Sequence, residues 1–300
     1  MDIKKFFIYK YEYLEERAKK RLEKNPKDII ALKDLVRVYT YRGDKKSRDE
    51  IVATLSMPKS LRKQVYYHLA MGMYMRDEGE LDLAMRHFIR AKYISEDDMV
   101  RISTPEPARE IVLTKLLLGD VEHLSYYMED VFQKEEDGCE ILELSMLVSD
   151  FLLRVGGDLR LIYEYLTKSE YKLPDFGFVE GRIWVFLRLG RVYLMIGAEH
   201  GKDSYFYKRR AMHYFRYAFI YYEHFINRYI EIFKEGNVSF ETLKENCTDY
   251  IQELYTAVKL CKEYGMPKEA QEYFAKFQRE YERLREYLRE EELLDVENKG

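Results

Sequence analysis

The chain has six histidines and three cysteines, the residue types that most often serve as metal ligands, catalytic bases or nucleophiles. His213 and His224 are eleven residues apart and would share one face of a continuous helix, but no cysteine or carboxylate completes a metal-binding set around them. The cysteines Cys139, Cys247 and Cys261 form no CxxC pair. Phosphate-binding glycine loops, HExxH motifs and nucleophile elbows do not occur in the sequence. We therefore predict no enzymatic activity, no catalytic residue, no metal site and no cofactor.

Residues 205–225 combine positive charge with aromatic rings. The basic residues are Lys208, Arg209, Arg210 and Arg216, and the tyrosines among them are Tyr205, Tyr207, Tyr214, Tyr217 and Tyr221. Cations neutralise phosphates and aromatic rings stack on bases, so this helix gives an alternative function as a nucleic-acid-associated regulator. However, a set of apolar residues recurs at spacings of three and four, which is typical of the buried face of a helix. We therefore interpret the run mainly as core and surface packing and do not expect nucleic acid to be the main partner.

The boundaries between the predicted helices are marked by a glycine followed by an acidic residue. The pairs are Gly43-Asp44, Gly79-Glu80, Gly119-Asp120 and Gly157-Asp158, with glycines 36, 40 and 38 residues apart. Glycine accepts the left-handed conformation that ends a helix, and an acid is favoured at the start of the next one. Gly197 and Gly265 extend the pattern. A period of this length indicates an array of helix–turn–helix repeats with turns at these glycines.

The clearest repeat is residues 65–98, with small residues at Gly72, Ala84 and Ala91 and an aromatic ring at Phe88. This pattern resembles the tetratricopeptide repeat (TPR), in which small residues let two antiparallel helices approach closely. Divergent copies cover about residues 29–284. One copy has Gly190 in its first helix and Phe215 in its second, and another has Arg48 where the family has a small residue. The resemblance implies an all-α, TPR-like α-solenoid of antiparallel helix pairs.

The resemblance and the spacing of the glycines together predict four parts of the chain. These are a capping helix at 1–28, TPR-like repeats at 29–180, further repeats at 181–294 with an insertion at 198–210, and a tail at 295–300. The C-terminal third departs from regular repeats, because residues 207–233 continue without a helix break. We expect long helices there, one of them capped by Ser239 and running to Tyr264.

Composition is that of a helical protein with a large core and a heavily charged surface. Apolar residues make up 47% of the chain and charged residues 35%, and no stretch approaches the ~20 apolar residues of a membrane span. Asparagine and glutamine are scarce while Lys, Glu, Arg and Tyr are abundant, a bias that suits a thermophilic source. The odd number of unpatterned cysteines favours a reducing compartment, so we predict a cytoplasmic location and no membrane partner.

Charge is distributed unevenly along the chain. Residues 1–63 contain 18 Lys and Arg against 10 Asp and Glu, whereas residues 64–180 contain 12 against 24. One interpretation is that both regions are solvated helix faces. The other is a polarised solenoid that steers a partner of complementary charge, or that associates head to tail with a second copy.

The TPR resemblance places the first helix of each repeat along a concave groove, where Arg and Tyr are common in binding sites. The groove residues in this sequence would be Lys33, Arg37, Tyr41, Tyr66, Met73, Arg76, Arg109 and Arg191. The function implied is a non-catalytic protein–protein interaction scaffold or adaptor that binds an acidic segment of another protein or peptide. Reversing the charge of Arg37 and Arg76 is then expected to abolish capture while leaving stability nearly unchanged.

Overall fold

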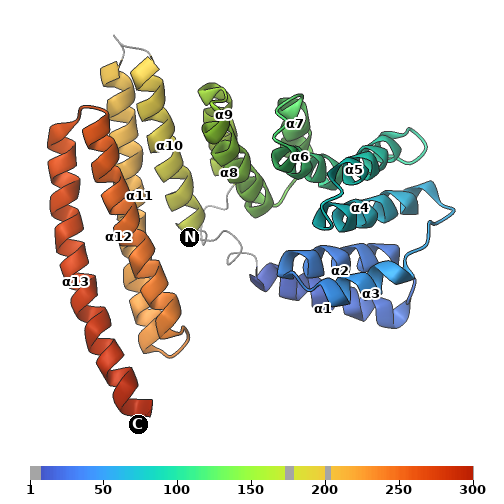
Figure 1. The fold of residues 1–300 in the computed structure, drawn as a ribbon, viewed down its shortest axis with the longest axis horizontal. Coiled ribbons are helices and arrows are strands. Elements are labelled where there is room, and N and C mark those ends of the chain that lie inside the picture. Colours follow the sequence, from blue (N-terminus) through green and yellow to red (C-terminus); the bar gives the residue numbers. More distant parts are fainter. Residues whose placement is uncertain (1–7, 173–178, 200–203, 300) are drawn as a thin grey trace. The chain divides into compact units, whose positions relative to one another are not determined.

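The structure, a computed structural model of the chain, describes residues 8–172, 179–199 and 204–299. In these residues the chain forms thirteen α-helices and no β-strand, which confirms the predicted all-α fold (Figure 1). None of these helices is both long and apolar enough to cross a lipid bilayer. The chain divides into two compact units, which we call the N-terminal unit (residues 2–151) and the C-terminal unit (residues 152–300).

The N-terminal unit is built from short helices that pack against their neighbours in the chain. They are α1 (Ile8–Lys24), α2 (Ile29–Arg42), α3 (Lys45–Thr54), α4 (Leu61–Asp77), α5 (Leu81–Glu96), α6 (Glu106–Leu118), α7 (Leu124–Lys134) and α8 (Gly138–Val155), whose last turn belongs to the C-terminal unit. Helix α2 packs against α1, α3 and α4, and α4 packs against α5 and α6. Such nearest-neighbour packing, which can be followed in Figure 1, is that of a solenoid-like helical array.

The predicted glycine turns are present, with one correction. Gly43, Gly79 and Gly119 follow α2, α4 and α6 with left-handed φ angles of 70°, 84° and 72°. The fourth turn is at Gly156, with φ 69°, and not at Gly157. Gly156 takes the left-handed conformation here, and the N–H of Gly157 donates to the carbonyl of Leu152 at 2.7 Å.

Small residues bring the paired helices together, as the repeat pattern predicts. A Cβ placed on Gly72 of α4 would lie 2.7 Å from Cδ1 of Phe88 in α5. A Cβ placed on Gly190 would lie 2.8 Å from Cε1 of Phe215. Both rings are fully buried, so each glycine makes room for an aromatic side chain of the partner helix. The same packing device therefore occurs in both units.

The C-terminal unit consists of longer helices. They are α9 (Leu159–Lys172), α10 (Val179–Glu199), α11 (Ser204–Lys234), α12 (Phe240–Glu263) and α13 (Pro267–Lys299). Consecutive helices from α9 to α13 pack together, and α10 to α13 lie side by side in Figure 1. The oxygen of Ser239 accepts from the N–H of Thr242 at 3.2 Å, which confirms the predicted cap. Gly197 lies inside α10 and not at a turn, because the helix continues to Glu199.

The segment predicted as an insertion and the one predicted as a tail are both largely helical in the described residues. Residues 198–199 end α10 and residues 204–210 form the first turns of α11, while 200–203 lie outside the described residues. Helix α13 extends to Lys299, beyond its expected end near Glu292. The long helices predicted for this third of the chain are thus confirmed.

Candidate functional site

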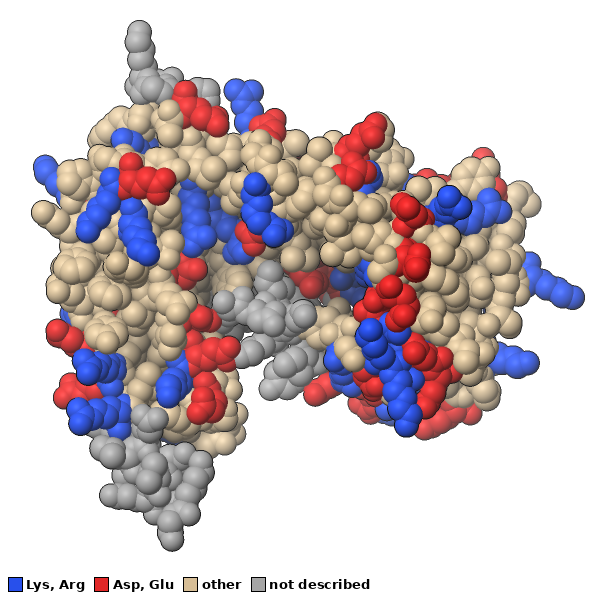
Figure 2. Space-filling model, in the orientation of Figure 1, with Lys and Arg blue, Asp and Glu red and all other residues tan. Residues whose placement is uncertain are grey.

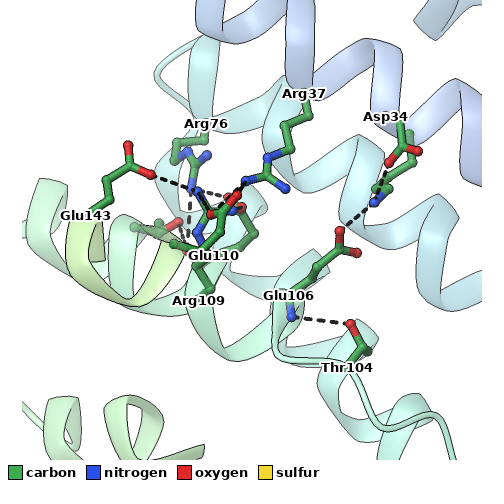
Figure 3. Close-up of polar contacts among 11 residues, drawn as sticks. Asp34, Arg37, Arg76, Thr104, Glu106, Arg109, Glu110 and Glu143 are labelled. Atoms are coloured by element: carbon green, nitrogen blue, oxygen red, sulfur yellow. Dashed lines mark hydrogen bonds and ion pairs between the residues drawn. The ribbon is translucent and has the colours of Figure 1, made fainter. Parts of the chain in front are cut away.

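Three of the four predicted groove arginines, Arg37, Arg76 and Arg109, come together in one buried group of charged side chains, which we call the charged cluster (Figure 3). Its members are Lys33, Asp34 and Arg37 of α2, Arg76 of α4, Glu106, Arg109 and Glu110 of α6, and Glu140 and Glu143 of α8. Four helices of the N-terminal unit, each predicted as the first helix of a repeat, therefore contribute to it. Arg37, Arg76 and Arg109 therefore lie close together, while their role as a binding groove stays a prediction.

Glu140 is bonded to arginines from two helices. Arg37 donates to both of its carboxylate oxygens, at 2.7 and 2.9 Å, and Arg109 lies 2.9 Å from Oε2. Arg109 also lies 3.7 Å from Glu110 and 3.6 Å from Glu143. Both bonds of Arg37 come from its Nη2 atom, so Glu140 is a shared, charge-assisted acceptor that links α2, α6 and α8.

The remaining cations of the charged cluster are also paired within the chain. Arg76 lies 2.7 Å from Glu110, and Lys33 lies 2.5 Å from Glu106 and 2.7 Å from Asp34. Residues four apart on a helix share a face. Glu106 and Glu110 therefore lie on the same side of α6, where Glu106 contacts a cation of α2 and Glu110 contacts a cation of α4. The predicted cations therefore already have carboxylate partners.

Burial and neighbouring charges shift the pKa values of the charged cluster in opposite directions. Burial alone would raise the pKa of Glu106, but Lys33 and Arg37 hold that pKa below its ordinary value. Burial would likewise raise the pKa of Glu110, and Arg76 and Arg109 hold it down. For Lys33, burial would lower the pKa, but the carboxylates raise it. All of these groups are therefore ionised at neutral pH, and each charge depends on its neighbours.

The charged cluster gives a physical account of the uneven charge along the sequence. Basic residues of the positive segment 1–63 pair with acidic residues of the negative segment 64–180. Some of the charges that the sequence suggested for binding a partner thus form ion pairs inside the N-terminal unit. That an external acidic segment binds these arginines stays a prediction, and such a segment would have to displace Glu106, Glu110 or Glu140.

The other predicted groove residues lie in different surroundings. The ring of Tyr41 stacks on that of Tyr11 at 3.9 Å between centroids, and Tyr66 packs against the core of α4 and α5. Met73 is a buried member of that core. Arg191 belongs to the C-terminal unit and donates to Glu253 of α12 at 2.8 Å.

One polar contact that sequence reasoning missed joins two histidines. Nδ1 of His68 in α4 lies 2.9 Å from Nδ1 of His87 in α5. Burial, together with the charges of His87 and Arg90, lowers the pKa of His68 to about 4. Among the described residues, no group of three or more His, Cys, Asp and Glu side chains is placed to hold a metal ion. The signal in the sequence was the 19-residue separation, which places one histidine on each helix of the clearest repeat.

An apolar groove runs between α12 and α13, and sequence reasoning missed it as well. We call it the α12–α13 groove; it has a volume of about 520 Å³. Its apolar lining is Phe240, Cys247, Ile251, Tyr281, Leu284 and Leu288, and its basic lining is Lys244, Arg285 and Arg289. Within the described residues, no Asp or Glu side chain lines it.

Neither protein-family models nor curated proteins match this sequence. The sites must therefore be judged from their own chemistry. The cations of the charged cluster are paired within the chain. In the described residues, the histidine pair lacks further metal ligands and the α12–α13 groove combines apolar surface with basic side chains alone.

Proposed function

We propose that the chain is a non-catalytic scaffold that binds an amphipathic helical segment of another protein in the α12–α13 groove. The observation that carries the proposal is the composition of this groove, whose floor is apolar and whose charged lining, among the side chains that the structure describes, is entirely basic. Binding grooves for helical segments combine an apolar floor with polar or charged edges. A segment with apolar side chains on one face and acidic residues beside them is complementary to this surface.

The dimensions of the groove support a helix of a few turns. Phe240 and Gln252 both line it and are separated by twelve residues of α12, or about 18 Å at 1.5 Å per residue. Leu284 and Cys247 are buried at its floor, whereas Tyr281 is 43% exposed at its edge. Such a gradient from buried floor to exposed edge leaves apolar area to be covered by a partner.

The basic residues lie against the aromatic side chains of the same groove. Lys244 is 5.9 Å from the ring centroid of Phe240, and the guanidinium of Arg285 is 6.0 Å from that of Tyr281. These contacts hold the cations beside the apolar floor, where acidic residues of a bound helix would meet them. We therefore infer that charge selects the partner and orients it, while the apolar floor supplies most of the affinity.

The helical array supports the same class of function in general terms. Solenoid-like arrays present extended surfaces built from successive helix pairs, and TPR-like membership remains part of this proposal. A cytoplasmic setting is also proposed, since Cys139, Cys247 and Cys261 are all free. Burial raises the pKa of Cys247 to about 11, so this thiol at the groove floor has little thiolate character at neutral pH.

A peptide selection followed by a matched pair of variants tests the proposal. A display library of amphipathic helices of about 14 residues, with acidic flanks, would be selected on the full chain. The selected peptides should bind Ile251→Glu at least tenfold more weakly, because the new carboxylate lies in the groove and repels the acidic flanks. Ile89→Glu makes the same change at an exposed position of α5 and should bind like the parent. Equal affinity for both variants would place the binding site elsewhere.

A further inference from the structure

The first four turns of α11 present basic and aromatic side chains to solvent. We call this surface the α11 patch; it consists of Tyr205, Phe206, Arg209, Arg210, Arg216 and Tyr217. Tyr205 is 76% exposed, Phe206 58% and Tyr217 44%. Single exposed aromatic side chains are common, but neighbouring ones that form a patch are typical of interaction surfaces.

Helical spacing arranges the patch as two neighbouring stripes. Tyr205, Arg209 and Arg216 are separated by four and seven residues and share one face of α11. Phe206, Arg210 and Tyr217 have the same spacing and form the adjacent stripe. Each stripe therefore begins with an aromatic ring and continues with arginine. From Tyr205 to Tyr217 the patch is about 18 Å long, which corresponds to about five stacked nucleotides at ~3.4 Å each.

The residues of α11 that pack in the core are a different set from those of the α11 patch. Ala211, Phe215, Ala218 and Tyr222 are buried in the core, as the spacing of the apolar residues predicted. The arginines of the patch instead point away from the core and are exposed. In the described part of the chain, neither Arg209 nor Arg210 nor Arg216 forms an ion pair, in contrast to the charged cluster.

Two hollows adjoin along the patch and share Arg209 and Met212. One, of about 530 Å³, is lined by Phe206, Arg210 and Arg216 among others. The second, of about 720 Å³, extends from Tyr205 to the turn between α12 and α13, where Lys268 and one acid, Glu269, also line it. On the face drawn in Figure 2, Lys and Arg side chains also gather over the end of the C-terminal unit at which α11 begins. Positive charge is thus concentrated at this end of the unit.

We propose that the α11 patch binds single-stranded nucleic acid, with its arginines on the phosphates and its exposed rings stacked on bases. Proteins that bind single strands without sequence preference combine these two features. In a duplex the faces of the bases are stacked inside the helix and cannot reach the aromatic rings of the patch. A duplex would therefore contact only the arginines and bind more weakly. A membrane surface is less well matched, because the apolar face of α11 that would enter the lipid is buried in the core.

Fluorescence anisotropy with labelled oligo(U) and oligo(dT) of about 12 nucleotides tests the proposal on the full chain. Single strands of either kind should bind more tightly than a duplex of equal length. Binding should weaken steeply between about 50 and 200 mM salt. The triple variant Arg209→Gln, Arg210→Gln, Arg216→Gln should lower the affinity by more than tenfold. It should also flatten the slope of log K against log salt by about 2, or ~0.7 for each phosphate that the variant no longer neutralises.

A matched variant separates the patch from overall charge. Arg62→Gln, Lys63→Gln, Arg86→Gln removes the same three charges from exposed positions of the N-terminal unit and should bind like the parent. Tyr205→Ala should weaken single-strand binding by roughly 5- to 150-fold without changing the salt slope, which is the mark of stacking.

Two outcomes would overturn the proposal. The first is equal affinity of the two triple variants for oligo(U) and oligo(dT). The second is binding to phosphatidylserine vesicles with no binding to either oligonucleotide, which would assign the patch to a lipid surface. The peptide affinity of the α12–α13 groove is a separate readout, so either proposal can fail without the other.

Discussion

Gly72 of α4 lies directly against the ring of Phe88 in α5. A Cβ on Gly72 would lie 2.7 Å from Cδ1 and 2.8 Å from Cζ of that ring, distances that real Cβ contacts do not reach. Phe88 is fully buried, so the ring has no free space into which to move. The close approach of these two helices therefore depends on the absence of a side chain at position 72.

Adding a single methyl group at position 72 should be enough to destabilise the folded chain. We predict that Gly72→Ala lowers the free energy of unfolding by about 1–3 kcal/mol through overpacking. At an unhindered helix position the same change would raise stability by up to about 1 kcal/mol. Denaturant unfolding followed by circular dichroism gives the sign directly. In a Phe88→Leu background the cost should shrink, because leucine is smaller; an unchanged cost would show that the ring is not the cause.

Glu140 is expected to be the most sensitive acid of the charged cluster. Glu140→Gln removes the charge that Arg37 and Arg109 share, and leaves two largely buried guanidinium groups short of a counter-charge. We predict a loss of about 3–5 kcal/mol in the free energy of unfolding. Asp98→Asn is the control, since the side chains of Asp98 and Arg101 are 91% and 77% exposed. That variant should change stability by less than about 0.5 kcal/mol. Equal effects of the two variants would contradict a structural role for the charged cluster.

Because of the charged cluster, reversing the charge of Arg37 and Arg76 is expected to lower the stability of the chain. From the sequence alone, Arg37→Glu with Arg76→Glu was expected to leave stability nearly unchanged. In the structure these substitutions would place carboxylates against Glu140 and Glu110. The double variant should therefore lose stability as well as any binding, so it cannot test a binding groove by itself. A thermal midpoint equal to that of the parent would contradict this expectation.

The histidine pair predicts a specific acid dependence. The pKa of His68 in the folded chain is about 4, below the ordinary histidine value of about 6.5. Between those two pH values the unfolded chain takes up a proton that the folded chain does not. The contribution of His68 to stability is therefore fully present above pH 6.5, is lost as pH falls toward 4, and changes no further below that. NMR titration of the imidazole signals measures this directly, and a His68 midpoint near 6.5 would contradict the buried pair.

Sequence reasoning was most successful where local chemistry decides the structure. The turns at Gly43, Gly79 and Gly119, the cap at Ser239 and the contact between Gly72 and Phe88 all follow from properties of one or two residues. The turn at Gly156 was placed one residue late, because a glycine pair does not reveal which member becomes left-handed.

The sites were harder to predict because they depend on residues distant in the sequence. Arg37 and Glu140 are 103 residues apart, and only the folding of the N-terminal unit brings them together. Arg48 shows the same limit. It departs from the repeat pattern, yet it is fully buried and bonded to Asp77 and Glu78 at the C-terminal end of α4. The sequence shows which residues are charged, but it does not show which charges already have a partner.

Hydrogen exchange of the full chain with a selected acidic amphipathic peptide tests the central claim most directly. We expect slower amide exchange in residues 240–252 and 281–289, which form the α12–α13 groove, and no change in residues 33–37 and 106–110 of the charged cluster. Protection at the charged cluster, with none in the α12–α13 groove, would contradict this expectation and would favour the predicted groove of the N-terminal unit as the binding surface.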